Sequence, residues 1–430
     1  MFRRLCVHAG RRYLMWEDET PFFYLGDTAW EMFHKLNREE MEFYLKTRAK
    51  QEYNVIQAVL LAEQDGLFMP NAYGRVPLML DRQWDICPDE GDGYDYWQHV
   101  DYGIDIAAEY SMFIGLLPSW GDKFNLKWGK GPVIFNESNA FEYGRWLGAR
   151  YRDQWNIIWI LGGDRPIENE EQEKIMDAMA RGIRSEDQNH LMTFHPCGAS
   201  SSVDYLKGKE YIDFHSVQSG HALECYSSNA MLRSTMEAEM KPALDMEPRY
   251  EDHPACFKED YGYLWRARDI RQNAWWNLLE GACGITYGNS SVWCFQTEKS
   301  GYWPYTWKEA MGHKGARQMK YIKRLFTSRP YYNFRSLDRL LDRNEGPEGQ
   351  CAGGTEDYAY IYTPFGMPIR ANLQYMGGSV IRASWYNPRN GKLKCAKIVP
   401  AVKTLFVPPA TGENKDWILI LEVLEKEVPL

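Results

Sequence analysis

The sequence predicts a (β/α)8 TIM barrel followed by a small all-β sandwich, and two patterns support this prediction. Eight short apolar runs recur between residues 22 and 287, and segments with a helical period lie between them. Strands that alternate with helices at this spacing pair in parallel, and eight such units are typical of a closed barrel. Beyond about residue 335 only strand-like segments remain, so we place the barrel in residues 1–335 and the sandwich in residues 336–430.

The expected strands follow a polar hairpin that residues 1–20 form as a cap on the barrel. The eight barrel strands are expected at Phe22–Leu25, Val55–Leu61, Met112–Leu117, Ile157–Leu161, Leu191–Phe194, Phe214–Val217, Pro242–Leu244 and Ile285–Tyr287. The sandwich strands are expected at Tyr358–Tyr362, Ile369–Gln374, Val380–Tyr386 and Trp417–Val423, with turns rich in Gly, Asn and Pro between them.

Helices are expected between the barrel strands. The stretch Asn37–Glu40 has the spacing of an N-terminal capping box and opens the first of these helices. Apolar residues recur four apart within Glu170–Arg184, and Phe141–Trp155 and Tyr263–Leu279 show the same period. The pattern is interrupted once, by the aromatic insertion Ala62–Gln98, which we expect to be an ordered lid over the active face because structureless loops of this length are uncommon.

Composition excludes several classes of function. A net charge of −9 and an isoelectric point near 5.6 argue against a nucleic-acid partner. No apolar run approaches the roughly 18 residues that a membrane span needs. Nine scattered cysteines and the lack of a secretion signal favour a reducing, cytoplasmic location, unless a signal peptide has been removed, in which case the protein is periplasmic or secreted. The sequence does not indicate the oligomeric state.

Polar and aromatic residues cluster where the predicted strands end, the position at which barrel enzymes carry their chemistry. The chain holds 17 Trp and 28 Tyr, and the face of an indole covers the C–H side of a sugar ring well. We therefore expect an oligosaccharide or polysaccharide as the ligand. The candidate substrate-binding residues are Asp27, Trp30, Trp120, His195, Gln218, Tyr250, Glu251 and Trp293.

Two carboxylates stand out among the strand-end residues. Asp164 follows the fourth predicted strand and Glu247 follows the seventh, so they face each other across the barrel. Glycoside hydrolysis needs two carboxyl groups that flank one bond. Gly162 and Gly163 would let the shorter Asp164 side chain approach that bond. The alternative is that each carboxylate caps a helix or forms a structural ion pair.

Metal and cysteine chemistry are less well supported. His195, His215, His221 and His253 fall at strand ends or in loops, but no HxH or HExxH spacing occurs, so we expect neither a metal nor another cofactor. No cysteine has a recognisable histidine partner, which argues against a thiol nucleophile.

Several motifs resemble the apiosidase-like glycoside hydrolase family. They are Phe23–Trp30, Asn54–Gln57, Asn71–Gly74, Trp159–Asp164 and Glu247–Glu251. The stretches Ser384–Gly391 and Asp416–Trp417 resemble the β-sandwich, named for collagen binding, that commonly follows such barrels. The resemblance implies a barrel glycosidase that acts on plant cell-wall glycans such as pectin side chains. It also implies that Asp164 is the acid/base and Glu247 the nucleophile.

One departure from related barrel glycosidases affects the mechanism. Enzymes with acids on the fourth and seventh strands typically carry Asn-Glu on the fourth, whereas this chain has Gly163-Asp164. Retention of the anomeric configuration is therefore an inference. The competing hypothesis is a carbohydrate-binding protein without catalysis, in which the rim carboxylates only bind sugar hydroxyls. The sugar, the linkage and the choice between end-on and mid-chain attack stay open, and so does glycan binding by the sandwich, which we interpret as a structural brace.

Overall fold

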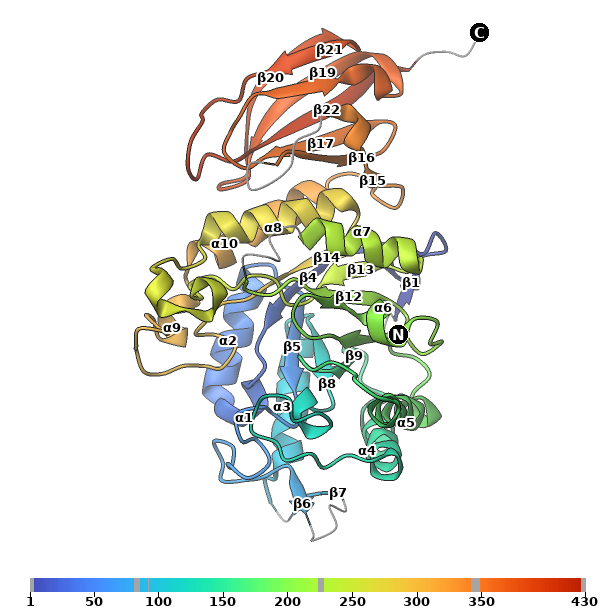
Figure 1. Ribbon diagram of the computed structural model, residues 1–430, viewed down its shortest axis with the longest axis vertical. Helices are drawn as coiled ribbons and strands as arrows, with labels where there is room; N and C mark the ends of the chain where they lie inside the picture. The colour runs from blue at the N-terminus through green and yellow to red at the C-terminus, as the bar shows by residue number, and fades with distance from the viewer. Residues whose placement is uncertain (1–3, 81–85, 92, 223–227, 342–348, 427–430) are drawn as a thin grey trace.

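The computed structural model describes residues 4–80, 86–91, 93–222, 228–341 and 349–426 (Figure 1). It consists of a barrel of parallel strands and an antiparallel sandwich, with helices α8 (Ala267–Glu280) and α10 (Lys314–Phe326) between them. No described helix is long and apolar enough to cross a membrane.

All eight predicted barrel strands are present, and the predicted TIM barrel is confirmed. They are β4 (Tyr24–Thr28), β5 (Val55–Val59), β8 (Phe113–Leu117), β9 (Ile157–Gly162), β10 (Met192–His195), β12 (His215–Gln218), β13 (Ala243–Asp245) and β14 (Gly284–Tyr287).

The strands join into one closed ring. Six of them form a parallel sheet in the order β10-β9-β8-β5-β4-β14, and β12 pairs in parallel with β13. Backbone hydrogen bonds connect the two sheets, from Asp213 N to Met192 O (2.8 Å) and from Cys283 N to Ala243 O (2.9 Å). Every residue of these strands is buried, because side chains fill the barrel on one face and helices cover the other.

The helices occupy the predicted segments but differ at their ends. The remaining long helices are α2 (Arg38–Lys50), α3 (Tyr96–Glu109), α4 (Glu137–Tyr151), α5 (Glu170–Glu186) and α7 (Ser228–Ala238), and the short ones are α1 (Met32–Lys35), α6 (Ser202–Leu206) and α9 (Trp307–Ala310).

Capping explains the differences in helix boundaries. The Asn37 side chain accepts a hydrogen bond from Glu40 N (2.9 Å), so α2 begins as predicted. A capping box between Asn136 and Asn139 starts α4 four residues before its predicted start. The carboxylate of Asp269 accepts from Arg266 N (2.7 Å), which delays α8 to Ala267.

The predicted N-terminal hairpin is present and extends to a third strand. Strands β1 (Leu5–Val7), β2 (Leu14–Trp16) and β3 (Pro21–Phe22) form an antiparallel sheet. The ring centre of Phe22 lies 5.5 Å from that of Trp16 and 5.4 Å from that of Phe113, the first residue of β8. Phe22 therefore belongs to this cap. Its assignment to the first barrel strand, which the apolar pattern had suggested, is wrong.

The insertion between β5 and α3 holds a short hairpin, β6 (Leu78–Leu80) and β7 (Ile86–Pro88). It leaves the carboxyl end of β5, where Gln64 N donates to Glu31 Oε1 (3.0 Å). At its other end Trp97 is buried in α3 and donates to Pro77 O (2.9 Å). Trp84 lies outside the described residues, and a role of this segment as a lid stays a prediction.

The sandwich follows the barrel as predicted. A six-stranded antiparallel sheet in the order β15-β16-β17-β22-β19-β20 packs against the pair β18-β21. These strands are β15 (Arg335–Ser336), β16 (Cys351–Gly354), β17 (Tyr358–Thr363), β18 (Ile369–Asn372), β19 (Gly378–Asn387), β20 (Lys392–Pro400), β21 (Lys403–Phe406) and β22 (Trp417–Lys426).

Part of the interface between barrel and sandwich is apolar. Along β17, the side chains of Tyr358, Tyr360 and Tyr362 join the barrel core, while Ala359 and Ile361 join the sandwich core. Alternate residues of a strand point to opposite faces, so one strand contributes to both cores. The barrel core thus extends onto one face of the sandwich sheet, a contact that a structural brace requires.

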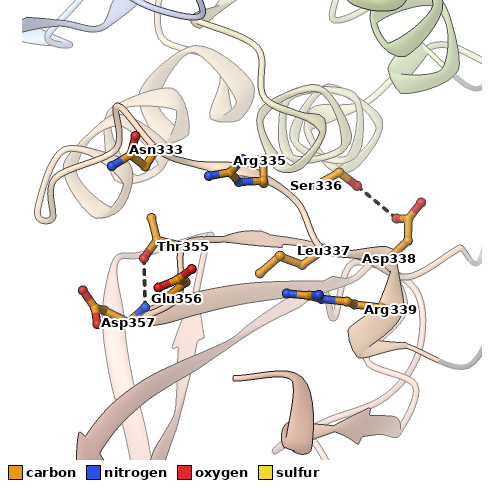
Figure 2. A pocket seen from close by; sticks show the side chains of 9 residues that line it. All are labelled: Asn333, Arg335, Ser336, Leu337, Asp338, Arg339, Thr355, Glu356 and Asp357. Atoms are coloured by element: carbon orange, nitrogen blue, oxygen red, sulfur yellow. Dashed lines mark hydrogen bonds between the residues drawn. The ribbon is translucent and has the colours of Figure 1, made fainter. Parts of the chain in front are cut away.

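A polar pocket of about 810 Å³ lies where the two domains meet (Figure 2). Its charged side chains are exposed, and the drawn hydrogen bonds, from Ser336 to Asp338 and from Asp357 N to Thr355, are local. None of the candidate site residues lines it.

A buried ion pair fastens the sandwich to the barrel. The Arg271 guanidinium on α8 donates two 2.8 Å hydrogen bonds to the carboxylate of Asp416, and both side chains are 1% exposed. Asp416→Ala should lower the free energy of unfolding by about 3–5 kcal/mol, because it leaves Arg271 charged and buried. Urea denaturation measures the loss.

The exposed interdomain pair of Arg233 and Asp338 (2.9 Å) provides the control for this experiment. Asp338→Ala should cost less than about 1 kcal/mol, because water screens that pair. Equal losses for the two variants would contradict the assigned role of the buried pair.

Candidate active site

The backbone turns sharply where β9 ends. Gly162, Gly163 and Asp164 all have positive φ, at 85°, 117° and 56°. A Cβ atom on Gly163 would lie 2.9 Å from Gly121 N, which donates to Gly163 O (2.9 Å). Only glycine fits this close approach between two strand ends, and the turn places Asp164 at the rim of the barrel.

The Asp164 carboxylate is held by two donors. Trp128 Nε1 donates to its Oδ2 over 3.1 Å, and Arg165 Nη1 donates to the same atom over 3.0 Å. Burial and the charge of the nearby Glu247 carboxylate raise the pKa of Asp164, although Arg165 and Trp128 oppose this rise. A carboxyl group with a raised pKa is suited to donate a proton.

Glu247 follows β13 and lies between two imidazoles. His195 Nε2 is 3.2 Å from its Oε2, and His221 Nε2 is 3.3 Å from its Oε1. Burial alone would raise the pKa of Glu247, but the two histidines lower it to about 2. The Glu247 side chain therefore stays ionised near neutral pH.

His195 connects the two carboxylate residues. Its Nδ1 is 3.3 Å from Asp164 N and 3.0 Å from Pro196 O. Asp164 N donates to this Nδ1, and Nε2 of the same ring faces the Glu247 carboxylate. The imidazole thus lies between the two carboxylate residues.

Aromatic rings surround this framework. Trp30 Nε1 donates to the hydroxyl of Tyr250 (2.9 Å), and the ring centre of Trp30 lies 5.1 Å from that of Trp120 and 5.2 Å from that of His195. Among the described residues, Trp120 Nε1 and Gln218 Oε1 are buried without a hydrogen-bond partner. Such atoms are rare in folded proteins, and the hydroxyl groups of a bound sugar would satisfy them.

The structure places two of the predicted site residues elsewhere. The Asp27 side chain points away from the barrel interior and accepts from Arg48 Nε and from Tyr44 OH, both over 2.5 Å. Glu251 accepts from Tyr287 OH (2.7 Å) and from Gly315 N (2.9 Å), next to α10. Both carboxylates are thus used inside the protein, because position near a strand end does not determine the direction of a side chain.

Trp293 lies in the loop after β14 and is half-buried. Its carbonyl accepts from Glu31 N (3.2 Å), next to the end of the first barrel strand. Contacts thus group four predicted residues with Glu247 and Asp164, namely Trp30, Trp120, His195 and Tyr250. Gln218 ends β12, and Trp293 lies in the loop after β14.

Two important residues were missed as site residues. Trp128 lies in a loop whose path no periodicity predicts, and its only signal was an aromatic residue beyond a strand end. Arg165 is fully buried and also donates to Glu63 Oε1 (2.7 Å), so one guanidinium is shared by two carboxylates. Burial raises the pKa of Glu63 to about 7, although Arg165 opposes this rise.

Two families match the two domains of the chain. Residues 8–333 match the family described as "Apiosidase-like, catalytic domain", and residues 341–422 match the "Putative collagen-binding domain of a collagenase". No curated protein matches the chain.

Solved structures of glycoside hydrolases resemble the whole chain. A glycoside hydrolase family 5 protein from Bacteroides vulgatus ATCC 8482 is 30% identical with a TM-score of 0.89, and the match covers 98% of this chain and 93% of that one. A second structure, titled "Glycoside hydrolase", is 29% identical with a TM-score of 0.90 and coverages of 99% and 98%.

The family match spans most of the chain, and the two carboxylates lie in the barrel that it covers. The competing hypothesis of a carbohydrate-binding protein without catalysis is therefore not supported. The chain belongs to the apiosidase-like family of glycoside hydrolases and is a glycosidase.

Proposed function

We propose that the protein is a retaining glycosidase that cleaves a plant cell-wall polysaccharide, a pectin side chain or a related glycan. Glu247 is the nucleophile and Asp164 the acid/base. The observation that carries this proposal is the opposite effect of the site on its two carboxyl groups, since the pKa of Asp164 is raised and that of Glu247 is lowered. Environments that separate two pKa values in this way assign the acid and the base.

The reaction then has two steps. The Glu247 carboxylate attacks the anomeric carbon and forms a glycosyl ester, while Asp164 gives its proton to the departing glycosidic oxygen. Water next attacks the anomeric carbon of this ester while Asp164 takes a proton from that water, and the bond from the anomeric carbon to Glu247 breaks, so Glu247 leaves as a carboxylate. His195 and His221 stabilise the returning negative charge, because both lie within 3.3 Å of Glu247 oxygens.

The substrate class has two supports. The aromatic rings and the unpartnered polar atoms of the site fit a hydroxyl-rich sugar ring. The family description, an apiosidase-like catalytic domain, supports a plant cell-wall glycan such as a pectin side chain.

Product analysis tests this proposal. The intact protein is incubated with a panel of pectic and hemicellulosic glycans, and proton NMR follows the first anomer that is released. We expect cleavage of a pectic glycan and a product with the anomeric configuration of the substrate. The opposite anomer would contradict the nucleophilic role of Glu247, and a lack of cleavage across the panel would contradict the substrate class.

A further inference from the structure

The contacts of the two carboxylates divide the site into two sides. Glu247 is contacted by His195 and His221. Asp164 is contacted by Trp128 and Arg165. In the proposed mechanism the nucleophile adjoins the sugar whose bond is cleaved, and the acid adjoins the leaving group. Side chains bound to Asp164 therefore mark the side of the leaving group.

Trp128 differs from the other tryptophans of the site in its exposure. It is 42% exposed, whereas Trp30 and Trp120 are each 3% exposed. Its Nε1 is nevertheless fixed by the 3.1 Å hydrogen bond to Asp164 Oδ2. Because the exposed Trp128 indole is bound to Asp164, it lies next to the leaving group that would receive a proton from Asp164.

Arg165 supports this indole from within the protein. Its Cζ lies 4.5 Å from the centre of the Trp128 ring, and its Nε donates to Trp128 O (2.9 Å). Its Nη1 and Nη2 are occupied by Asp164 and Glu63. Arg165 is fully buried, so it holds the ring in place and leaves ligand binding to the exposed part of the indole.

We propose that Trp128 is the platform of a leaving-group subsite, on which the sugar ring released by proton transfer stacks. The C–H face of a pyranose or furanose ring covers the exposed indole, and the glycosidic oxygen then lies beside the Asp164 carboxyl. This inference depends on the proposed role of Asp164 as the acid.

Two substrates with the same glycosyl group test this inference. One is the pectic glycan fragment that the wild-type enzyme cleaves, and the other is the glycosyl fluoride of the sugar that it transfers. Fluoride departs without a sugar on the leaving-group side. Trp128→Leu should lower kcat/KM for the glycan by roughly 10- to 100-fold, mainly through KM, and change that for the fluoride by less than about threefold.

Trp128→Phe is the matched variant, because it keeps a flat aromatic ring, although a smaller one, and removes the N–H donor. Its KM for the glycan should stay within about threefold of the wild-type value. The alkaline limb of its pH profile should move to higher pH, because the lost hydrogen bond favoured the ionised form of Asp164. Thermal denaturation verifies that both variants are folded.

The two substrates distinguish a failure of the proposed subsite from a failure of the proposed function. If the wild-type enzyme cleaves both substrates and Trp128→Leu affects them equally, or leaves the glycan unaffected, the platform does not exist. If the wild-type enzyme cleaves neither substrate, the proposed function itself has failed.

Discussion

Glu247→Gln should lower kcat by at least about 10⁴-fold and leave glycan binding largely intact. The amide has nearly the same shape as the carboxylate but cannot form a stable glycosyl ester, so the first chemical step is lost. Steady-state kinetics on the cleaved glycan measure the loss, and calorimetric titration of the inactive variant measures binding.

Glu239→Gln is a suitable control for this variant. Glu239 precedes the same strand at the opposite end of the barrel, where it lies 3.4 Å from His215 Nε2 and pairs with Lys241 (2.7 Å). Carboxylates at that end of a barrel contribute to stability rather than catalysis, so its kcat should remain close to that of the wild type. Substantial turnover by Glu247→Gln would contradict the nucleophilic role.

Azide provides an independent readout. In Glu247→Ala the space left by the side chain admits a small anion, which should restore turnover of the glycosyl fluoride. The product should be a glycosyl azide with the anomeric configuration opposite to that of the substrate. Rescue without such a product would argue against direct attack at this position.

Asp164→Asn should lower kcat/KM for the glycan by about 10²–10⁴-fold, because the amide cannot protonate the glycosidic oxygen. The effect on the glycosyl fluoride should be much smaller in the glycosylation step, since fluoride leaves without a proton. Comparison of the two substrates at one pH measures this difference.

The pH profile of the wild type should show the same group. As the proposed acid, Asp164 is needed in its protonated form, so activity should be lost as pH rises through its raised pKa. As the proposed nucleophile, Glu247 is needed in its ionised form, so activity should be lost on this account only as pH falls toward about 2. Asp164→Asn should abolish the alkaline decline.

Glu168→Gln is the control for Asp164→Asn. Glu168 lies in the same loop but is exposed and pairs with Lys127. The Glu168→Gln variant should therefore have a pH–activity profile close to that of the wild type. An unchanged alkaline decline in Asp164→Asn would assign that decline to another group and contradict the acid role.

Hydrophobic periodicity was sufficient to predict the fold. Each of the eight barrel strands overlaps a short apolar run of the sequence, because strands of a barrel are buried on both faces. The overlap is smallest at β12, where His215, Ser216 and Gln218 are polar. Helix ends were less accurate, since a capping side chain such as Asn136 determines where α4 begins. Phe22 was assigned to the wrong sheet because an apolar residue packs equally well in a cap or in a barrel strand.

The sequence was sufficient to predict the pair of Asp164 and Glu247, but not the side chains that surround them. Asp164 and Glu247 follow strands whose order places them on one rim. The direction of a side chain in a loop depends on contacts between distant segments, which is why Asp27 and Glu251 turned out to be used in ion pairing and hydrogen bonding within the protein.

The sequence by itself determined the two domains, the parallel barrel and the positions of the two carboxylates along it, because these follow from local periodicity and strand order. Only the tertiary structure decided which carboxyl has the raised pKa and which the lowered one, because burial, His195, His221 and Arg165 act through space. It also decided that Trp128, remote from Asp164 in sequence, donates to that carboxylate with its indole exposed.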